Sequence, residues 1–215
     1  MSDAVFLPAR RGVCLILSSP SGGGKTTLAR LLLKAEPLLA HSISATTRPP
    51  REHESDGVDY FFVSSDRFET MRDAGELLES AEVFGNLYGT PAHPVRHALA
   101  EGKDILFDID WQGAAAIASL LPEDTVRVFI LPPSAEELAR RIYGRGTDAK
   151  GVIEDRLKAA ANEISHWAEY DYVIVNRDVE ESLNTLQAIL TAERHKRHRQ
   201  HGLIDFVSEF KASES

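Results

Sequence analysis

The stretch Leu15-Ile16-Leu17-Ser18-Ser19-Pro20-Ser21-Gly22-Gly23-Gly24-Lys25-Thr26-Thr27 decides the fold of this chain. The apolar run from Val13 to Leu17 predicts a buried strand, and the leucines that recur after Thr27 predict a helix. A turn rich in serine and glycine joins the two, and Lys25 and Thr26 open the helix. A strand, a glycine turn, Lys-Thr and a helix are together the context of a phosphate-binding P-loop.

The physical basis of such a loop is direct. Glycines let successive backbone N–H groups curl around an anion, because no Cβ stands in the way. The helix N-terminus adds unpaired N–H donors and the positive end of its dipole. Lys25 can reach the β- and γ-phosphates of ATP, and the Thr26 hydroxyl can ligate Mg²⁺. The residues predicted to bind ATP in this loop are Ser19, Pro20, Ser21, Gly22, Gly23, Gly24, Lys25, Thr26 and Thr27.

The loop departs from the motif G-x-x-x-x-G-K-[ST] at its first position, where this chain has Ser19. That position helps the turn rather than the phosphate chemistry. The alternative is a glycine-rich turn between strand and helix that carries a surface lysine. The order of strand, glycines, Lys25 and Thr26 favours the P-loop.

Length and composition limit the class of protein. At 215 residues the chain is one large domain or a core with insertions, and it can bury a sizeable core. Its 43% hydrophobic and 27% charged residues are ordinary for a globular protein. The net charge of −9, from 33 acidic and 24 basic residues, argues against a broad nucleic-acid surface. Any anionic ligand must therefore be held by locally placed Arg, Lys and N–H groups.

No stretch predicts a membrane segment. No apolar run approaches the roughly 18 residues of a membrane span, and Met1 to Gly12 lacks a signal-peptide pattern. The single cysteine, Cys14, lies in the first predicted strand and is expected to be a small buried core residue. We therefore expect a cytoplasmic protein with no membrane and no nucleic-acid partner, and the oligomeric state stays open.

Predicted helices alternate with short, almost continuously apolar strands along the chain. The strands are 13–17, 60–63, 105–110, 126–131 and 172–176. The helices are 25–35, 64–71, 91–100, one from 111, one from a capping box at Ser134 and Glu137, 152–167 and 179–200. This pattern predicts the α/β class, with a parallel sheet covered by helices on both faces. Ligands of such sheets bind beyond the carboxyl ends of the strands.

Two carboxylates, Asp108 and Asp110, are predicted to finish the strand that starts at Ile105. They occupy the place of a Walker-B carboxylate, so one of them can hold Mg²⁺ or its water across from Thr26. Two residues apart, they point to one side if the strand stays regular. The alternative is a pair of solvated carboxylates at a strand end.

Arginines gather in two places. Those at 140, 141, 145 and 156 surround a glycine hinge, where a mobile segment can bring them onto a transferring phosphoryl group. The alternative is a solvated, salt-bridged helix face. Arg48 and Arg51 flank two prolines that fix the backbone and can present both guanidiniums to one phosphate. Tyr60 and Tyr88 can add phenolic donors, although an aromatic residue alone is more often part of the core.

From about Gly12 to Gln200 the chain resembles the guanylate kinase family. The likeness is carried by Ser19-Pro20-Ser21-Gly22-Gly23-Gly24-Lys25-Thr26, Ser44-Ala45-Thr46-Thr47-Arg48-Pro49-Pro50-Arg51, Gly57-Val58-Asp59-Tyr60-Phe61-Phe62-Val63, Val83-Phe84-Gly85-Asn86-Leu87-Tyr88-Gly89-Thr90, Asp108-Ile109-Asp110-Trp111-Gln112-Gly113 and Arg141-Ile142-Tyr143-Gly144-Arg145-Gly146. Several motifs in the right order are more specific than any one of them. The resemblance implies a single domain, 1–215, with a three-layer P-loop NTPase core, a GMP-binding insertion at about 44–92 and a short helical lid at about 136–156.

The resemblance also implies an activity, the reaction ATP + GMP ⇌ ADP + GDP with Mg²⁺, and a role for each matching position. Arg48, Arg51, Tyr60 and Tyr88 would bind the GMP phosphate; Glu79, Ser44 and Thr90 would form the base pocket; Asp108 would support that pocket or the metal. Arg141, Arg145 and Arg156 would be lid arginines, and Asn176 would sit near the adenine. The catalytic residues would be Lys25, Arg48, Arg141, Arg145 and Arg156.

Two other functions remain open at the level of the sequence. The first is a P-loop kinase for another small phosphate acceptor, which the set of Glu79, Ser44 and Thr90 disfavours. The second is a non-catalytic, guanylate-kinase-like module that binds proteins, which the intact Gly24-Lys25-Thr26 disfavours. The basic run 194–199 would suit a nucleic acid, but a helix C-terminus favours cations in any case.

Overall fold

The computed structural model describes residues 9–83, 85–143 and 150–212. Its main sheet has five strands in the order β2 (Leu39–His41), β7 (Asp104–Phe107), β1 (Cys14–Ser18), β8 (Thr125–Leu131) and β9 (Tyr172–Val175). Every neighbouring pair is parallel. The predicted parallel sheet is therefore confirmed, except that the predicted strand at 60–63 lies outside it and its edge strand β2 was not predicted. The P-loop leaves the carboxyl end of its central strand.

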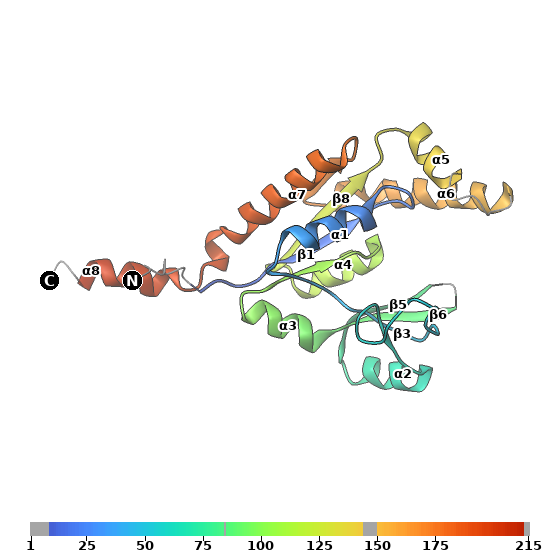
Figure 1. Cartoon of the computed structure of the whole chain (residues 1–215). Coiled ribbons are helices and arrows are strands. Elements are labelled where there is room, and N and C mark those ends of the chain that lie inside the picture. The colour runs from blue at the N-terminus through green and yellow to red at the C-terminus, as the bar shows by residue number, and fades with distance from the viewer. Residues whose placement is uncertain (1–8, 84, 144–149, 213–215) are drawn as a thin grey trace.

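Helices cover both faces of this sheet (Figure 1). α1 (Lys25–Ala35) and α7 (Val179–Arg194) lie on one face, and α3 (Ala92–Ala100) and α4 (Trp111–Leu120) lie on the other. The residues of β1 alternate between the two layers: Leu15 and Leu17 join the cluster with α1 and α7, whereas Cys14 and Ile16 join the cluster with α3 and α4. Burial raises the pKa of the Cys14 thiol to about 12, as expected for an inert core residue.

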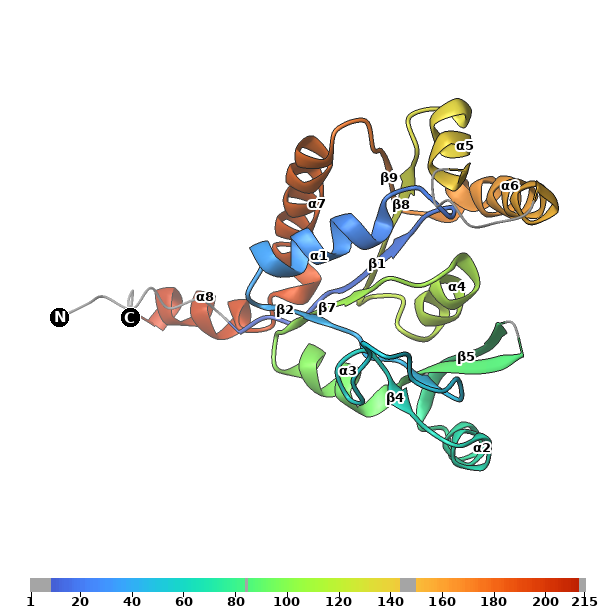
Figure 2. The same ribbon diagram turned by 45° about the vertical axis from the view of Figure 1, so that its right-hand side comes forward.

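A second, smaller sheet lies beside the α3–α4 layer (Figure 2). Its order is β4 (Phe61–Phe62), β3 (Ala45–Thr46), β6 (Asn86–Pro91) and β5 (Leu77–Val83). β5 and β6 form an antiparallel hairpin, and α2 (Ser65–Asp73) packs on this sheet through Phe68 and Met71. Ser64, at which this helix was predicted to begin, caps α2 by accepting a hydrogen bond from the Arg67 N–H at 3.2 Å. The sequence predicted neither the hairpin nor a second sheet.

α5 (Ala135–Tyr143) and α6 (Lys150–Ser165) follow β8 and pack on each other through Leu138, Ile142 and Ala160. The predicted capping box is half right. Ser134 Oγ accepts a hydrogen bond from the Glu137 N–H at 3.1 Å, but the Glu137 carboxylate bonds to arginine side chains instead of returning to Ser134. α6 lies two residues earlier than predicted and continues into a 3₁₀ turn, His166–Glu169.

The prediction of a single helix over 179–200 was wrong. α7 stops at Arg194, a 3₁₀ turn spans Arg197–Arg199, and a further helix, α8 (Leu203–Ala212), projects away from the body of the molecule (Figures 1 and 2). Within the described ranges, no helix is long and apolar enough to cross a membrane.

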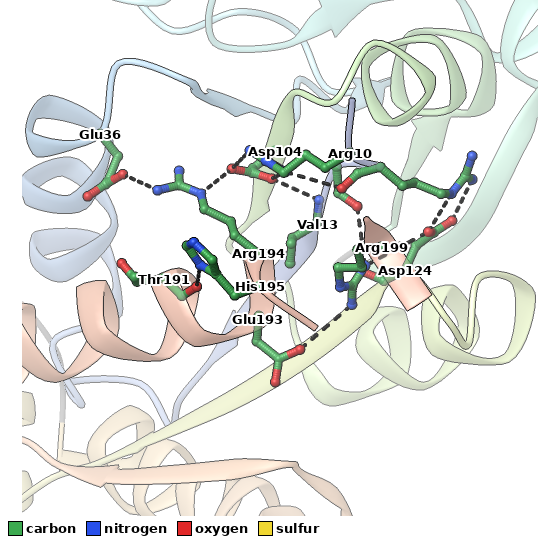
Figure 3. Close-up of polar contacts among 12 residues, drawn as sticks. Arg10, Val13, Glu36, Asp104, Asp124, Thr191, Glu193, Arg194, His195 and Arg199 are labelled. Atoms are coloured by element: carbon green, nitrogen blue, oxygen red, sulfur yellow. Dashed lines mark hydrogen bonds and ion pairs between the residues drawn. The ribbon is translucent and has the colours of Figure 1, made fainter. Parts of the chain in front are cut away.

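A buried network of charged side chains holds these terminal segments against the sheet (Figure 3). Asp104, at the start of β7, is 0% exposed. Its carboxylate accepts two hydrogen bonds from Arg10, at 2.7 and 2.9 Å, one from Arg194 Nε at 2.7 Å and one from the Val13 N–H at 2.9 Å. Arg194 also donates to Glu36 at 2.7 Å. A buried carboxylate with this many donors is fully paired.

The second half of the network surrounds Asp124, which precedes β8. Arg11 donates two hydrogen bonds to its carboxylate, both at 2.6 Å. Arg199 is 2% exposed, and its Nη1 donates to the backbone oxygens of Gly12 and Asp124 at 3.2 and 3.3 Å. The two arginines at the ends of the basic run 194–199 are thus used inside the fold. The four residues between these arginines are exposed.

We expect Asp104→Ala to lower the free energy of unfolding by about 3 kcal/mol, because Arg10 and the Val13 N–H would lose their buried carboxylate partner and Arg194 would keep only Glu36. Urea or guanidinium unfolding followed by circular dichroism measures the change. Asp73→Ala, at a largely exposed carboxylate, is the matched control and should stay within about 0.5 kcal/mol. Equal effects of the two substitutions would show that the network is not what stabilises this edge.

Candidate active site

The P-loop spans residues 19–24, between the end of β1 and the start of α1. Gly22 and Gly24 adopt φ values of 89° and 101°, a region that side chains with a Cβ rarely enter. A Cβ on Gly24 would also lie 2.3 Å from Nδ2 of Asn176. Glycine is therefore required at position 24 both by the backbone conformation and by the close approach of a side chain.

Asn176 follows β9 and is 3% exposed. Its Nδ2 donates to the Gly23 oxygen at 3.1 Å, and its Oδ1 accepts from Ser182 Oγ at 3.1 Å. The residue predicted to lie near the adenine thus supports the P-loop directly. It also lines a cavity of about 430 Å³, whose other lining residues are Gly22, Gly24, Thr27, Arg140, Arg141 and Val179.

Lys25 is turned toward the segment that leaves β7. Its Nζ donates to the backbone oxygen of Asp108 and, at 3.4 Å, to that of Ile109. Burial lowers the pKa of Lys25, and the carboxylates of Asp108, Asp110 and Glu163 oppose that shift. Thr26 lies exposed in the first turn of α1.

The structure corrects the prediction for the two carboxylates after β7. The strand ends at Phe107, so Asp108 and Asp110 lie in the connection to α4 rather than at regular strand positions. Asp110 caps α4, with its Oδ1 accepting from the Gly113 N–H at 2.9 Å. Asp108 Oδ1 instead lies 3.0 Å from His41 Nε2. The two side chains are held by different partners, and a regular strand pleat does not align them.

A second cavity of about 190 Å³ brings most of the predicted GMP-binding residues together. The predicted residues that line it are Ser44, Tyr60, Glu79, Tyr88, Asp108 and Asp110. Its walls come from both sheets and from the start of α4, where Gly113 contributes. Because Lys25 bonds to the backbone of Asp108, this cavity and the P-loop share the segment 108–110.

Glu79 lies on β5 and contributes one of the carboxylates that line this cavity. Its Oε1 accepts a hydrogen bond from Thr90 Oγ1 at 2.6 Å. Thr90 is fully buried and does not line the cavity, so it acts on Glu79 from behind. Burial raises the pKa of Glu79, and the hydrogen bond from Thr90 opposes the shift.

The predicted phosphate-binding residues form a neighbouring group. The Arg48 guanidinium lies over the rings of Tyr60 and Phe62, at 5.4 and 5.9 Å from their centroids. Its Nη2 also donates to Glu54 at 2.8 Å. The ring of Tyr88 meets that of Tyr60 edge-on at 6.0 Å. Arg51 is exposed, and its N–H donates to Glu54 Oε2 at 2.8 Å.

The arginines of α5 lie near the P-loop. Arg141 donates to Glu137 at 2.7 Å and reaches the Gly22 oxygen at 3.4 Å, whereas Arg140 makes two hydrogen bonds to Glu137, both at 2.7 Å. Hydrogen bonds from Arg140 and then Arg141 lower the pKa of Glu137 to about 2. Arg145 lies outside the described residues, and for Arg156 only the backbone, in α6, is described.

Two residues at this site had no signal in the sequence. Glu163 on α6 accepts a hydrogen bond from the Ser21 N–H at 3.0 Å, and His41 meets Asp108. Just beyond Glu163, His166 stacks on Trp111, with ring centroids 3.6 Å apart and planes 10° from parallel. The contacts of Glu163 and His166 join the C-terminal end of α6 and the turn after it to the P-loop and to α4. Each of the three contacts joins residues far apart in the sequence, so no local sequence pattern predicts them.

Thr26, Asp108 and Asp110 carry the hard oxygen ligands that suit Mg²⁺. In the part of the chain that the structure describes, no group of three or more His, Cys, Asp or Glu side chains could hold a metal ion. Mg²⁺ commonly binds through one or two carboxylates together with substrate phosphates. The residues present therefore fit an ion that arrives with a nucleotide rather than one held by the protein alone.

A P-loop at the carboxyl end of a parallel sheet, with a second polar cavity beside it, defines an α/β P-loop kinase fold. The model of the family described as Guanylate kinase matches residues 11–193. The guanylate kinase of Paramagnetospirillum magneticum is 51% identical to this chain, over 100% of both chains. The guanylate kinase of Sphingopyxis alaskensis is 56% identical, over 96% of this chain and 94% of the relative. A crystal structure of guanylate kinase from Anaplasma phagocytophilum matches with a TM-score of 0.78 at 41% identity, over 95% of this chain and 97% of the other. The chain belongs to the guanylate kinase family.

We expect Gly24→Ala to weaken ATP binding at least tenfold and to destabilise the fold, because the new Cβ would meet Asn176 at a strained φ. Isothermal titration with ATP and thermal unfolding measure the two effects. Gly75→Ala is the matched control, since Gly75 has a φ of 67° but nothing within 4 Å of its Cβ position. It should cost about 1 kcal/mol of stability and leave ATP affinity unchanged. Unaltered ATP affinity in Gly24→Ala would contradict the role of the loop.

Proposed function

We propose that this chain transfers the γ-phosphoryl group of ATP to GMP, giving ADP and GDP. The observation that carries the proposal is the contact of Lys25 with the backbone of Asp108. It joins a phosphate-binding loop to the wall of a cavity that contains Glu79, Tyr60 and Tyr88. A donor and an acceptor bound on the two sides of this segment would have their phosphates close together.

On the donor side, the proposed ATP site is the P-loop, residues 19–27, with its N–H groups at the start of α1. Lys25 would leave the carbonyl oxygens of segment 108–110 to meet the β- and γ-phosphates. Its burial strengthens this interaction, because charges attract more strongly away from water. Asn176 would act by holding the Gly23 oxygen, which fixes the shape of the loop.

On the acceptor side, Glu79 would accept hydrogen bonds from the N1–H and the 2-amino group of guanine. Thr90 holds one oxygen of Glu79 from behind, which sets the direction of the carboxylate. Adenine has no donor at N1 or C2, so the Glu79 oxygen that Thr90 does not hold would be left without a donor. Such a mismatch can discriminate by about 10⁴. Ser44 and Asp108, which line the same cavity, would complete the base pocket.

The GMP phosphate would bind between Tyr60, Tyr88 and the two arginines at 48 and 51. Stacking on Tyr60 and pairing with Glu54 hold the Arg48 guanidinium beside the cavity. Arg51, which is exposed, would turn inward when the phosphate arrives. Two guanidiniums and two phenols can surround a phosphate whose charge the acidic protein as a whole would repel.

The reaction needs no covalent intermediate. Mg²⁺, held by the phosphates with Thr26 and Asp108 or Asp110, would neutralise developing charge. Arg141, Arg145 and Arg156 would stabilise the equatorial oxygens, as Arg141 already lies beside Gly22. We propose residues 44–92 as the GMP-binding part and 136–156 as a lid whose closure excludes water.

An acceptor panel tests this function. ADP formation from ATP and Mg²⁺ is measured with GMP, AMP, CMP, UMP and dTMP, and the wild type should use GMP alone. In Glu79→Gln, kcat/KM for GMP should fall at least about 100-fold, because an amide cannot accept both guanine donors. Glu82→Gln, at an exposed position on the same strand, is the control and should leave kcat/KM unchanged.

The pH dependence gives a second measurement for the same residue. Since burial raises the pKa of Glu79, KM for GMP should increase as the pH falls through a value above the usual range of a glutamate. Glu79→Gln should lose this acid limb. Turnover with another nucleotide instead of GMP would overturn the guanine assignment. Folded protein that binds ATP but phosphorylates nothing would indicate a binding module.

Lys25→Ala should reduce kcat at least about 100-fold, because the ammonium would no longer stabilise charge on the transferred group. Lys34→Ala is the matched control, since Lys34 is exposed in the last turn of the same helix and should leave kcat unchanged. The measurement is the steady-state rate at saturating ATP and GMP. Unchanged turnover in Lys25→Ala would remove Lys25 from the proposed chemistry.

A further inference from the structure

His41 is the last residue of β2, the strand at one edge of the main sheet. The parallel register sets it opposite Leu106 in β7, one residue before that strand ends. Its ring therefore lies beside the segment that leaves β7, and its Nε2 is 3.0 Å from Asp108 Oδ1. Both residues line the 190 Å³ cavity that contains Glu79.

The chemistry of this contact fixes which group donates. An ionised carboxylate only accepts hydrogen bonds, so Nε2 of His41 must carry the proton. One carboxylate oxygen of Asp108, Oδ1, is thus committed to His41. The other, Oδ2, is the oxygen that can face a donor on a molecule in the cavity.

Asp108 is therefore held in two places. Lys25 bonds to its backbone oxygen, and His41 bonds to its side chain. The first contact positions the main chain beside the P-loop but leaves χ1 and χ2 free. The second contact, together with a hydrogen bond from the backbone N–H of Asp108 itself, sets the direction of the carboxylate. Asp110 has a comparable restraint from the cap of α4, through the Gly113 N–H.

We propose that His41 is a positioning residue of the acceptor site, which holds the Asp108 carboxylate so that its second oxygen accepts a hydrogen bond from an amino or hydroxyl group of the bound nucleotide. This inference rests on the proposed function, because it needs a nucleotide in that cavity. His41 transfers no proton and touches no reacting atom. Its effect is on the affinity for the acceptor, not on the phosphoryl transfer step.

The test uses His41→Ala and the conservative His41→Gln, whose amide N–H₂ can still donate to Asp108. His41→Ala should raise KM and the dissociation constant for GMP about tenfold, as one hydrogen bond to a charged group predicts, with KM for ATP and kcat unchanged. In His41→Gln the dissociation constant for GMP should return to within about twofold of the wild-type value. Titration calorimetry with GMP gives the dissociation constant without turnover, and thermal unfolding confirms that the variants fold. His97→Ala, at an exposed histidine of α3, is the control.

A double-mutant cycle separates positioning from direct contact. If His41 acts through Asp108, His41→Ala should cause no further loss of GMP affinity in an Asp108→Ala background. A full additional loss in that background would overturn the proposal, because His41 would then contact the nucleotide itself. Unchanged GMP affinity in His41→Ala would overturn it as well. Glu79→Gln distinguishes the two failures: if it weakens GMP binding, only the role of His41 is wrong, and if it does not, the proposed function fails.

Discussion

The attachment of the P-loop to the chain that leaves β7 is the constraint on which the site depends. Lys25 donates to the oxygens of Asp108 and Ile109, and Ser18 Oγ donates to Ile109 at 2.9 Å. These bonds hold the segment 108–110 against the loop, and the same segment forms one wall of the second cavity. The P-loop and a cavity whose walls come from both sheets are thereby kept in contact by a few hydrogen bonds to one short piece of backbone.

The sequence predicted well those features whose cause is local. The glycines at 22 and 24 are required by positive φ values within the loop, and Ser64 caps the helix that begins beside it. The apolar strands of the main sheet follow from burial on both faces, which β1 shows by sending alternate residues to the two layers. The strand β6 carried no such pattern, because its partners in the second sheet, not its own residues, determine it.

Local reasoning failed where distant residues decide. It continued β7 to Asp110. In the structure the Asp110 side chain instead accepts a hydrogen bond from the Gly113 N–H and caps α4, so the strand ends before it. Local reasoning could not find Glu163, which reaches Ser21 across 142 positions, or His41, which meets Asp108 across 67. The place of Asn176 near the adenine, which the resemblance implied, stays a prediction, and the structure adds that its amide donates to the Gly23 oxygen. Contacts of this kind exist only once the sheet has brought the carboxyl ends of its strands together.

Stability and chemistry are divided between the two ends of the main sheet. At the amino ends, Asp104 and Asp124 are buried and paired with arginines, so their charges are fully used within the protein. At the carboxyl ends, Lys25 and Arg141 donate to acceptors that a nucleotide phosphate can replace, namely a backbone oxygen and a neighbouring glutamate. An acidic chain can therefore bind anions at one end without weakening its fold, because the cations needed for binding are not those that stabilise the core.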